Sequence, residues 1–299
     1  MKPVLFALDG HDALAEHLCR AHALEPGLFE RRRFPDGETY LRLRTAVAGR
    51  AVILLCSLDR PDEKAMPLIF AADAAHAQGA VQVGLIAPYL AYMRQDRAFH
   101  EGEAITSISF ARLISAAFDW LVTVDPHLHR HPQLDCIYSI PAIAVSAAAP
   151  IADWLRANVP SPMLIGPDAE SSQWVAQVAA LAAIPSAILR KRRQGDLDVV
   201  IDGPELEVPA TRTPVVIDDI ISSGGTMIEA VKLVRRRARR DPICLGVHAL
   251  FAGDAFERLS RAGAARIVTS NTIPHATNAI DVGAEIGAAL TTVLRRSPD

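Results

Sequence analysis

Short apolar runs alternate along the chain with longer segments in which apolar residues recur every three or four positions. The runs lie at residues 4–8, 52–57, 81–87, 121–124, 163–166, 186–189, 215–217, 243–250 and 266–269. Runs of this length predict strands buried on both faces, and the periodic segments predict helices packed against them. The sequence therefore predicts an α/β protein whose sheets are mainly parallel and flanked by helices.

This alternation occurs twice, on either side of an Ala- and Pro-rich segment around Pro141–Val145. Helices are predicted at residues 11–24, 62–78, 151–158, 173–183, 227–237, 253–262 and 281–295, and another begins near Thr106. A chain of 299 residues is long enough for two domains. We predict a first domain over residues 1–145, a second over 146–280, and a C-terminal helix over 281–299 that can pack back on the first.

The composition is that of a globular protein, half hydrophobic, with a net charge of -3. This charge gives no general reason to expect nucleic acid or a membrane surface as a partner. The apolar run after Met1 is too short for a signal peptide or a membrane span, and no other stretch approaches a span. The four cysteines are scattered without a C-x-x-C pair, which indicates reduced thiols. We expect a cytoplasmic metabolic protein.

The segment Val215–Thr226 joins a predicted strand to a predicted helix through a turn of small residues. Gly224 and Gly225 permit a tight turn whose backbone N–H groups point inward. Three hydroxyl side chains add donors beside the helix N-terminus: Ser222, Ser223 and Thr226. Backbone and hydroxyl donors gathered at a helix N-terminus are typical of a phosphate-binding loop.

Two adjacent acids, Asp218 and Asp219, lie where the same predicted strand ends. Carboxylates repel a phosphate, so at this edge of a sheet they suit sugar hydroxyls or a metal ion. The alternative is that Thr226 only caps the helix, with Glu229 completing a capping box. That alternative leaves two costly carboxylates at a strand end unexplained.

Two segments of the first half carry further candidate residues. Residues 29–34 and 39–44 predict two strands joined by Pro35–Glu38, which on spacing alone is an ordinary hairpin. The irregular segment Pro88–Arg97 combines two tyrosines with two arginines, and arginine beside aromatic rings suits a nucleotide. A solvated loop in which the arginine pairs with local acids is a plausible alternative for Arg97 and a weaker one for Arg94, which has tyrosines around it.

Two more predicted strands end in candidate ligands. The segment Asp125–His131 contains three alternating histidines, a pattern that favours one metal ligand over three. The alternative is a surface loop with no metal ligand at all. Asp168 lies at a strand-to-helix turn, where it is either a ligand or a helix cap.

Two runs of cations have different interpretations. The run Arg190–Arg193 predicts either a solvated turn or a lid that closes on a polyanion, and we expect residues 190–196 to be disordered without a ligand. The run Arg235–Arg240 lies at the end of a predicted helix, where cations complement the helix dipole.

The Asp218–Thr226 segment resembles the motif that binds phosphoribosyl pyrophosphate (PRPP) in the type I phosphoribosyltransferase superfamily. With five other motifs in the same order, it resembles the ribose-phosphate pyrophosphokinase family over nearly the whole chain. The other motifs are Phe34–Glu38, Pro88–Arg97, Val124–His127, Gly166–Asp168 and Lys191–Arg193. The resemblance implies two phosphoribosyltransferase-like domains.

The resemblance also implies a role for each motif. ATP would be held by Phe34, Asp36 and Glu38 together with Arg94, Gln95 and Asp96. Mg²⁺ would be held by His127 and Asp168, and Lys191 and Arg193 would belong to a flexible catalytic loop. Asp218 and Asp219 would bind the ribose hydroxyls of ribose 5-phosphate, and Ser222, Ser223, Gly224, Gly225 and Thr226 its 5-phosphate. In this family the Phe34–Glu38 loop reaches a neighbouring subunit, which implies a homo-oligomer of at least two chains.

The implied reaction transfers the diphosphoryl group of ATP to the anomeric hydroxyl of ribose 5-phosphate and gives PRPP and AMP. Ser222, Ser223 and Ala169 depart from the commonest bacterial pattern, and the Ser222–Thr226 and Gly166–Asp168 forms resemble the archaeal-type branch. Two other functions share part of the pattern. A phosphoribosyltransferase that consumes PRPP would need only the Asp218–Thr226 loop, and a non-catalytic associated subunit would be expected to lack Lys191, Arg193 or His127.

Overall fold

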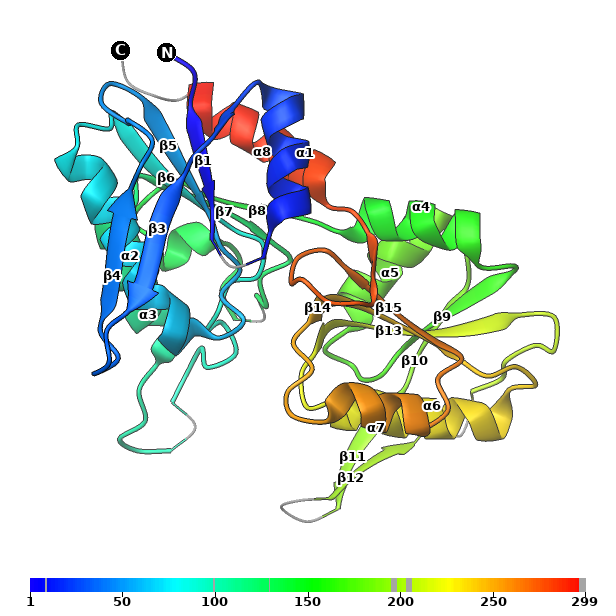
Figure 1. Ribbon diagram of the computed structural model, residues 1–299. Helices are drawn as coiled ribbons and strands as arrows, with labels where there is room; N and C mark the ends of the chain where they lie inside the picture. The colour runs from blue at the N-terminus through cyan, green and yellow to red at the C-terminus, as the bar shows by residue number, and fades with distance from the viewer. Residues whose placement is uncertain (9, 99, 129, 195–197, 203–205, 296–299) are drawn as a thin grey trace. The chain divides into compact units, whose positions relative to one another are not determined.

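The computed structural model describes residues 1–299 except 9, 99, 129, 195–197, 203–205 and 296–299, and for residues 190–194 and 198–202 the backbone alone (Figure 1). The chain divides into two compact units. The first comprises Met1–Ser146 and Gly283–Asp299, and the second comprises Ala147–Val282.

A six-stranded parallel sheet forms the centre of the first unit, in the order β2-β1-β5-β6-β7-β8. Its strands are β1 Val4–Ala7, β2 Glu25–Pro26, β5 Ala51–Leu55, β6 Gln82–Ala87, β7 Trp120–Val124 and β8 Ala142–Val145. Helices α1 (Asp12–His22) and α8 (Gly283–Arg295) cover one face, and α2 (Pro61–Ala77) and α3 (Thr106–Ala117) cover the other (Figure 1). The central strands are apolar and almost wholly buried, as the unbroken apolar runs predicted.

A second six-stranded parallel sheet forms the centre of the second unit, in the order β10-β9-β13-β14-β15-β16. Its strands are β9 Pro162–Gly166, β10 Ser186–Ile188, β13 Thr213–Ile221, β14 Ile243–Ala249, β15 Arg266–Ser270 and β16 Asn278–Ile280. Helices α4 (Ala148–Asn158) and α5 (Ser172–Ala182) lie on one face, and α6 (Gly225–Arg237) and α7 (Ala255–Arg261) lie on the other (Figure 1). The predicted α/β class with mainly parallel sheets is confirmed.

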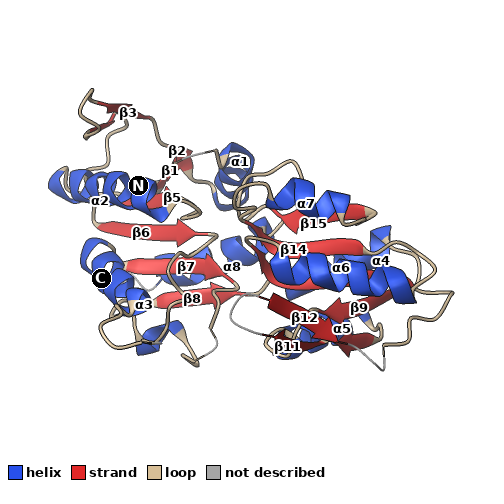
Figure 2. Ribbon diagram, turned by 90° about the horizontal axis from the view of Figure 1, so that it is seen from below, coloured by secondary structure: helices blue, strands red, loops and turns tan. Residues whose placement is uncertain are grey.

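Two antiparallel hairpins stand apart from these sheets. One pairs β3 (Phe29–Arg33) with β4 (Thr39–Leu43), and the other pairs β11 (Arg190–Gln194) with β12 (Asp198–Asp202). Figure 2 shows β3 projecting beyond α2. A short 3-10 helix, Leu134–Cys136, precedes β8.

The last helix returns to the first unit, where α8 packs against α1, β7 and β8. The hydroxyl of Thr291 lies 3.3 Å from Nδ1 of His22 on α1. Gly287 lets the two helices approach, because a Cβ at this position would lie 2.2 Å from Nε2 of His22. Residues from both ends of the chain therefore complete one core.

Three expectations about element boundaries were wrong. The strand expected at 215–217 spans Thr213–Ile221, because Asp218 and Ile220 continue the ladder with Gly246 and His248 of β14. The helix expected at 151–158 begins at Ala148, directly after the edge strand β8 that the Ala- and Pro-rich segment forms beside the division between the two units. The run at Arg190–Arg193, for which a turn was one expectation, has strand backbone through Gln194. The expected disorder of residues 190–196 stays a prediction, and residues 195 and 196 lie outside the described part.

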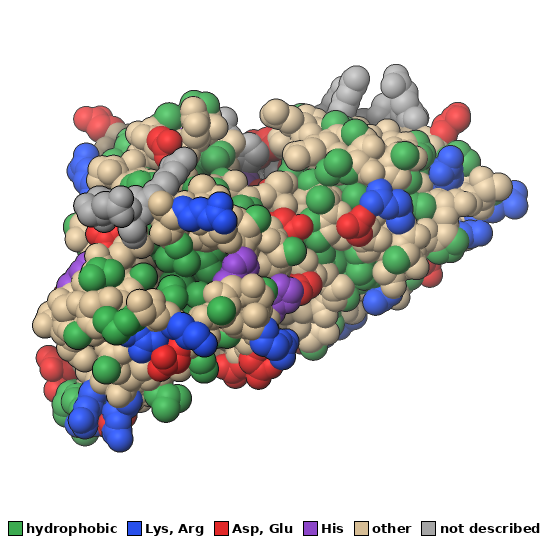
Figure 3. Space-filling view, turned by 90° about the horizontal axis from the view of Figure 1, so that it is seen from above, with side chains coloured by type: hydrophobic (Ala, Val, Ile, Leu, Met, Phe, Trp, Pro, Cys, Tyr) green, Lys and Arg blue, Asp and Glu red, His purple; other side chains and the backbone are tan. Residues whose placement is uncertain are grey.

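The surface carries charges of both signs. On the face seen in Figure 3, acidic and basic side chains are interspersed. Within the described residues, no helix is both long enough and apolar enough to cross a membrane.

Candidate active site

β13 carries the two adjacent acids and the small-residue turn to one end of the second unit's sheet. Val215–Ile217 are fully buried, whereas Asp218 and Asp219 are half-buried. Gly224 is the N-cap of α6 and has a φ of 73°, in the left-handed region that glycine adopts without strain. The first N–H groups of a helix have no intrahelical partner, and none of the described side chains caps those of α6. These groups and the helix dipole favour an anion.

The turn is anchored through its carbonyl groups. The amides of Phe251 and Ala252 donate to the carbonyl oxygens of Ile221 and Ser222, at 2.9 and 3.1 Å. The capping-box alternative is wrong, because the N-cap is Gly224 and Glu229 accepts instead from Nζ of Lys232 at 2.8 Å. The turn therefore presents donors at a fixed position.

Three carboxylates lie near one another at this strand end. Burial and the negative charges of Asp219 and Asp168 raise the pKa of Asp218 well above its ordinary value. The amide of Asp219 donates to Oδ1 of Asp218 at 3.1 Å, and this hydrogen bond offsets only part of the rise in the pKa of Asp218. A cation or sugar hydroxyl donors at this position would relieve the repulsion among the acids.

Asp168 lies in the turn between β9 and α5. Its Oδ1 accepts from the amides of Glu170 and Ser171 at 3.1 and 3.3 Å, which closes the turn that precedes the helix. Gly166 fits this turn, since a Cβ there would lie 2.6 Å from the Ser171 hydroxyl. The N-cap of α5 is Ser171 rather than Asp168, and no side chain among the described residues caps this helix start. The charge of Asp168 acts on Asp218.

In the first unit, the segment Pro88–Arg97 follows β6. Tyr92 has a left-handed φ of 63°, its ring centroid lies 4.8 Å from that of Phe110, and its hydroxyl donates to Asp62 on α2. The hydrogen bond to the Asp62 carboxylate and partial burial raise the pKa of Tyr92 to about 12. These contacts fasten the segment to α2 and α3.

The three residues expected to bind a nucleotide in this segment differ in environment. Arg94 is exposed, and the amide oxygen of Gln95 accepts from the Thr106 hydroxyl at 3.2 Å. Asp96 is 9% exposed and forms an ion pair of 2.6 Å with Arg130. Arg130 is a partner that the sequence did not indicate.

The predicted hairpin between residues 29 and 43 is confirmed, and Phe34, Asp36 and Glu38 are exposed at its tip. The amide of Phe34 donates to the Glu38 carbonyl at 2.8 Å, and the Glu38 amide donates to Oδ1 of Asp36 at 3.1 Å. The tip is thus a defined turn with three exposed side chains.

Other predicted site residues lie on other elements of their own units. His127 is half-buried after β7, and His129 lies outside the described residues. In the described part of the chain, no three His, Cys, Asp or Glu side chains are close enough together to hold a metal ion. Lys191 and Arg193 lie on β11, opposite Ile201 and Val199 of β12.

Comparison with known families divides the chain into two matched regions. Residues 3–117 match the family described as the N-terminal domain of ribose phosphate pyrophosphokinase. Residues 133–285 match the family described as the phosphoribosyl transferase domain.

Curated relatives support the same assignment over most of the chain. The ribose-phosphate pyrophosphokinase of Methanopyrus kandleri is 34% identical over 87% of this chain and 89% of its own length. That of Methanosarcina acetivorans is 32% identical over 93% of this chain and 95% of its own length. The crystal structure of phosphoribosylpyrophosphate synthetase from Mycobacterium smegmatis has the same fold, with a TM-score of 0.85, 23% identity and 99% of both chains covered.

Proposed function

This chain belongs to the ribose-phosphate pyrophosphokinase family, and from that premise we propose that it transfers the diphosphoryl group of ATP to the anomeric hydroxyl of ribose 5-phosphate, giving PRPP and AMP. The observation that carries the proposal is the end of β13. At this strand end, carboxylates that suit sugar hydroxyls lie next to the uncapped N-terminus of α6, which suits a phosphate.

Ribose 5-phosphate would bind along this strand end. The N–H groups that begin α6, with the hydroxyls of Ser222, Ser223 and Thr226, would hold the 5-phosphate. Asp218 and Asp219 would accept hydrogen bonds from the ribose hydroxyls, which places the anomeric carbon away from the phosphate loop. The pKa of Asp218 is raised in the free protein, and a cation bound beside it would lower that pKa.

The acids also fit Mg²⁺, which proteins usually hold through one or two carboxylates together with substrate phosphates. From the family resemblance, Asp168 and His127 are the side chains that we assign to Mg²⁺. Bound Mg²⁺ would neutralise the charge of the phosphate chain during transfer.

ATP would be held by two segments of the first unit. Phe34 offers an exposed ring for the base, and Asp36 and Glu38 offer acceptors for its amino group or the ribose hydroxyls. The exposed guanidinium of Arg94 and the amide of Gln95 would contact the nucleotide in the second segment. Because Asp96 is already paired with Arg130, its role would be to position that arginine.

Two further assignments follow from the family. Lys191 and Arg193 would stabilise the charge that develops on the transferred group, since phosphoryl transfer asks for positioning and electrostatics rather than a protein nucleophile. The exposed tip at Phe34–Glu38 would complete its site in a second copy of the chain, so the working unit would be at least a homodimer.

The test is formation of AMP from ATP and Mg²⁺, with and without ribose 5-phosphate, in wild type, Lys191→Ala and Arg192→Ala. Arg192→Ala removes the same charge from the neighbouring position and serves as the matched control. We expect AMP only when the acceptor is present, and a loss of about 10³-fold in rate for Lys191→Ala. If only ADP forms, or if the control loses as much activity, the proposed reaction or the role of Lys191 is wrong.

A further inference from the structure

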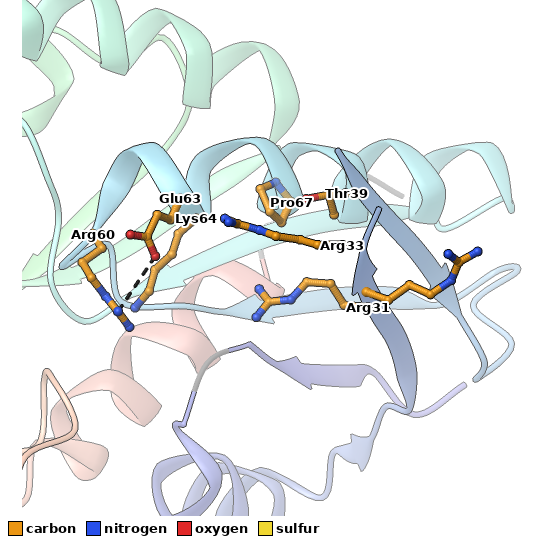
Figure 4. Close-up of a pocket in the computed structure, with 8 residues that line it drawn as sticks. Arg31, Arg33, Thr39, Arg60, Glu63, Lys64 and Pro67 are labelled. Atoms are coloured by element: carbon orange, nitrogen blue, oxygen red, sulfur yellow. Dashed lines mark ion pairs between the residues drawn. The ribbon is translucent and has the colours of Figure 1, made fainter. Parts of the chain in front are cut away.

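A cavity of about 310 Å³ lies in the first unit between β3 and the start of α2, and none of its lining residues is assigned above to a substrate (Figure 4). Five cationic side chains and one carboxylate line it, although the net charge of the chain is -3. They are Arg31, Arg32, Arg33, Arg60, Lys64 and Glu63. Such a local excess of positive charge in a hollow attracts anions.

β3 directs two of its arginines toward the cavity. In the hairpin, Arg31 lies opposite Leu41 and Arg33 opposite Thr39, so these residues share one face. Figure 4 shows the guanidinium groups of Arg31 and Arg33 extending toward the first turn of α2. Arg32 borders the cavity but lies on the other face, with its guanidinium carbon 4.5 and 4.4 Å from the ring centroids of Phe34 and Tyr40.

The start of α2 adds positive charge that is only partly balanced. Lys64 is 5% exposed, donates to the Ser57 carbonyl at 2.9 Å and pairs with Asp59, so its charge is already compensated. Arg60 is less compensated, because its contacts with Asp59 and Glu63 are 3.8 and 3.9 Å long and its own side chain is well exposed. None of the described side chains caps α2, and the positive end of the dipole of this 17-residue helix lies at this start.

We propose that this cavity binds a small oxyanion with two or more negative charges, of the phosphate or diphosphate class. The guanidinium forks of Arg31 and Arg33 match the oxygen geometry of such anions, with Arg60 as a third donor. The lining contains no aromatic ring, which argues against recognition of a base and for recognition of the anion itself. The bound anion bridges the β3–β4 hairpin to α2.

The test is isothermal titration of inorganic diphosphate into the full chain, at constant ionic strength and in a buffer free of phosphate. Wild type is compared with the double variant Arg31→Ala/Arg33→Ala and with Arg42→Ala. Arg42 is exposed, lies opposite Glu30 on the other face of the same hairpin and does not line the cavity. Far-UV circular dichroism and thermal melting verify that each variant is folded.

We expect the double variant to weaken diphosphate binding by about tenfold or more, because two charge-assisted contacts are lost, and Arg42→Ala to change it less than about twofold. Hydrogen exchange with diphosphate should then protect residues 29–43 and the first turns of α2 in wild type. Equal weakening by Arg42→Ala would indicate general charge attraction and overturn the proposal. Protection confined to residues 222–226 would assign the anion to the ribose 5-phosphate loop and overturn it as well.

Discussion

Alanine substitution of two neighbouring glycines separates the structural role of the phosphate loop from its binding role. Gly224 has a φ of 73°, and a Cβ there would make ordinary contacts of 3.5 Å and beyond. Gly225 is the first residue of α6, and a Cβ there would meet nothing within 4 Å. The two positions therefore differ in backbone strain and not in crowding.

The magnitudes follow from this geometry. Alanine in the left-handed region costs about 1–2 kcal/mol, so Gly224→Ala should lower the free energy of unfolding by that amount. Alanine is better than glycine in a helix by about 0.5–1 kcal/mol, so Gly225→Ala should leave stability unchanged or slightly higher. A difference of about 2 kcal/mol corresponds to melting temperatures roughly 4–8 °C apart.

Binding should respond differently from stability. The open space at Gly225 is where the 5-phosphate would approach the backbone, so a methyl group there should weaken ribose 5-phosphate binding about tenfold or more, or about 1.4 kcal/mol. Thermal melting and calorimetric titration of ribose 5-phosphate measure the two effects, with ATP binding as the control. Wild-type affinity in a stable Gly225→Ala protein would refute the loop assignment, and an equal loss of stability in both variants would refute the backbone reasoning.

Three further predictions concern the surroundings of the site. Tyr92→Phe keeps the ring contact with Phe110 but loses the hydrogen bond to the exposed Asp62, so the free energy of unfolding should fall by about 1 kcal/mol. The KM for ATP should rise while the KM for ribose 5-phosphate stays constant, and equal changes in both KM values would contradict this. Asp218→Asn removes a carboxylate whose pKa is raised in the folded protein, so the unliganded variant should melt at a higher temperature than wild type at neutral pH. This gain in melting temperature should vanish as the pH falls below the ordinary aspartate pKa of about 3.9. A gain that does not depend on pH would exclude the buried charge as its cause. Gly166→Ala would place a Cβ 2.6 Å from the Ser171 hydroxyl and Cδ1 of Ile188, so urea denaturation should show a loss of about 1–3 kcal/mol, and an unchanged midpoint would contradict the packing.

The parts of the fold that could be predicted are those in which one short segment determines its own structure. β5 is apolar at every position because helices cover both faces of its sheet, and the sequence shows this directly. The Gly224–Gly225 turn was predictable because the left-handed φ at Gly224 suits glycine. The strand β2 has only two residues, too few for any periodicity to appear.

The contacts that could not be predicted join residues distant in sequence. Arg130 pairs with Asp96 across 34 positions, and Tyr92 donates to Asp62 across 30. Neither pair leaves a pattern in the sequence, because each depends on how a loop folds over a neighbouring element. The basic cavity has the same origin, since the arginines of β3 form a site only when α2 brings Arg60 beside them.

The central claim is that two phosphoryl groups move together, and phosphorus NMR of the products tests it most directly. Enzyme, Mg²⁺, ATP and ribose 5-phosphate are mixed, and the products are followed with time. The account predicts equal amounts of AMP and a sugar with a diphosphate on its anomeric oxygen, seen as a pair of coupled phosphorus signals. ADP together with a ribose bisphosphate, which carries no such coupling, would contradict it.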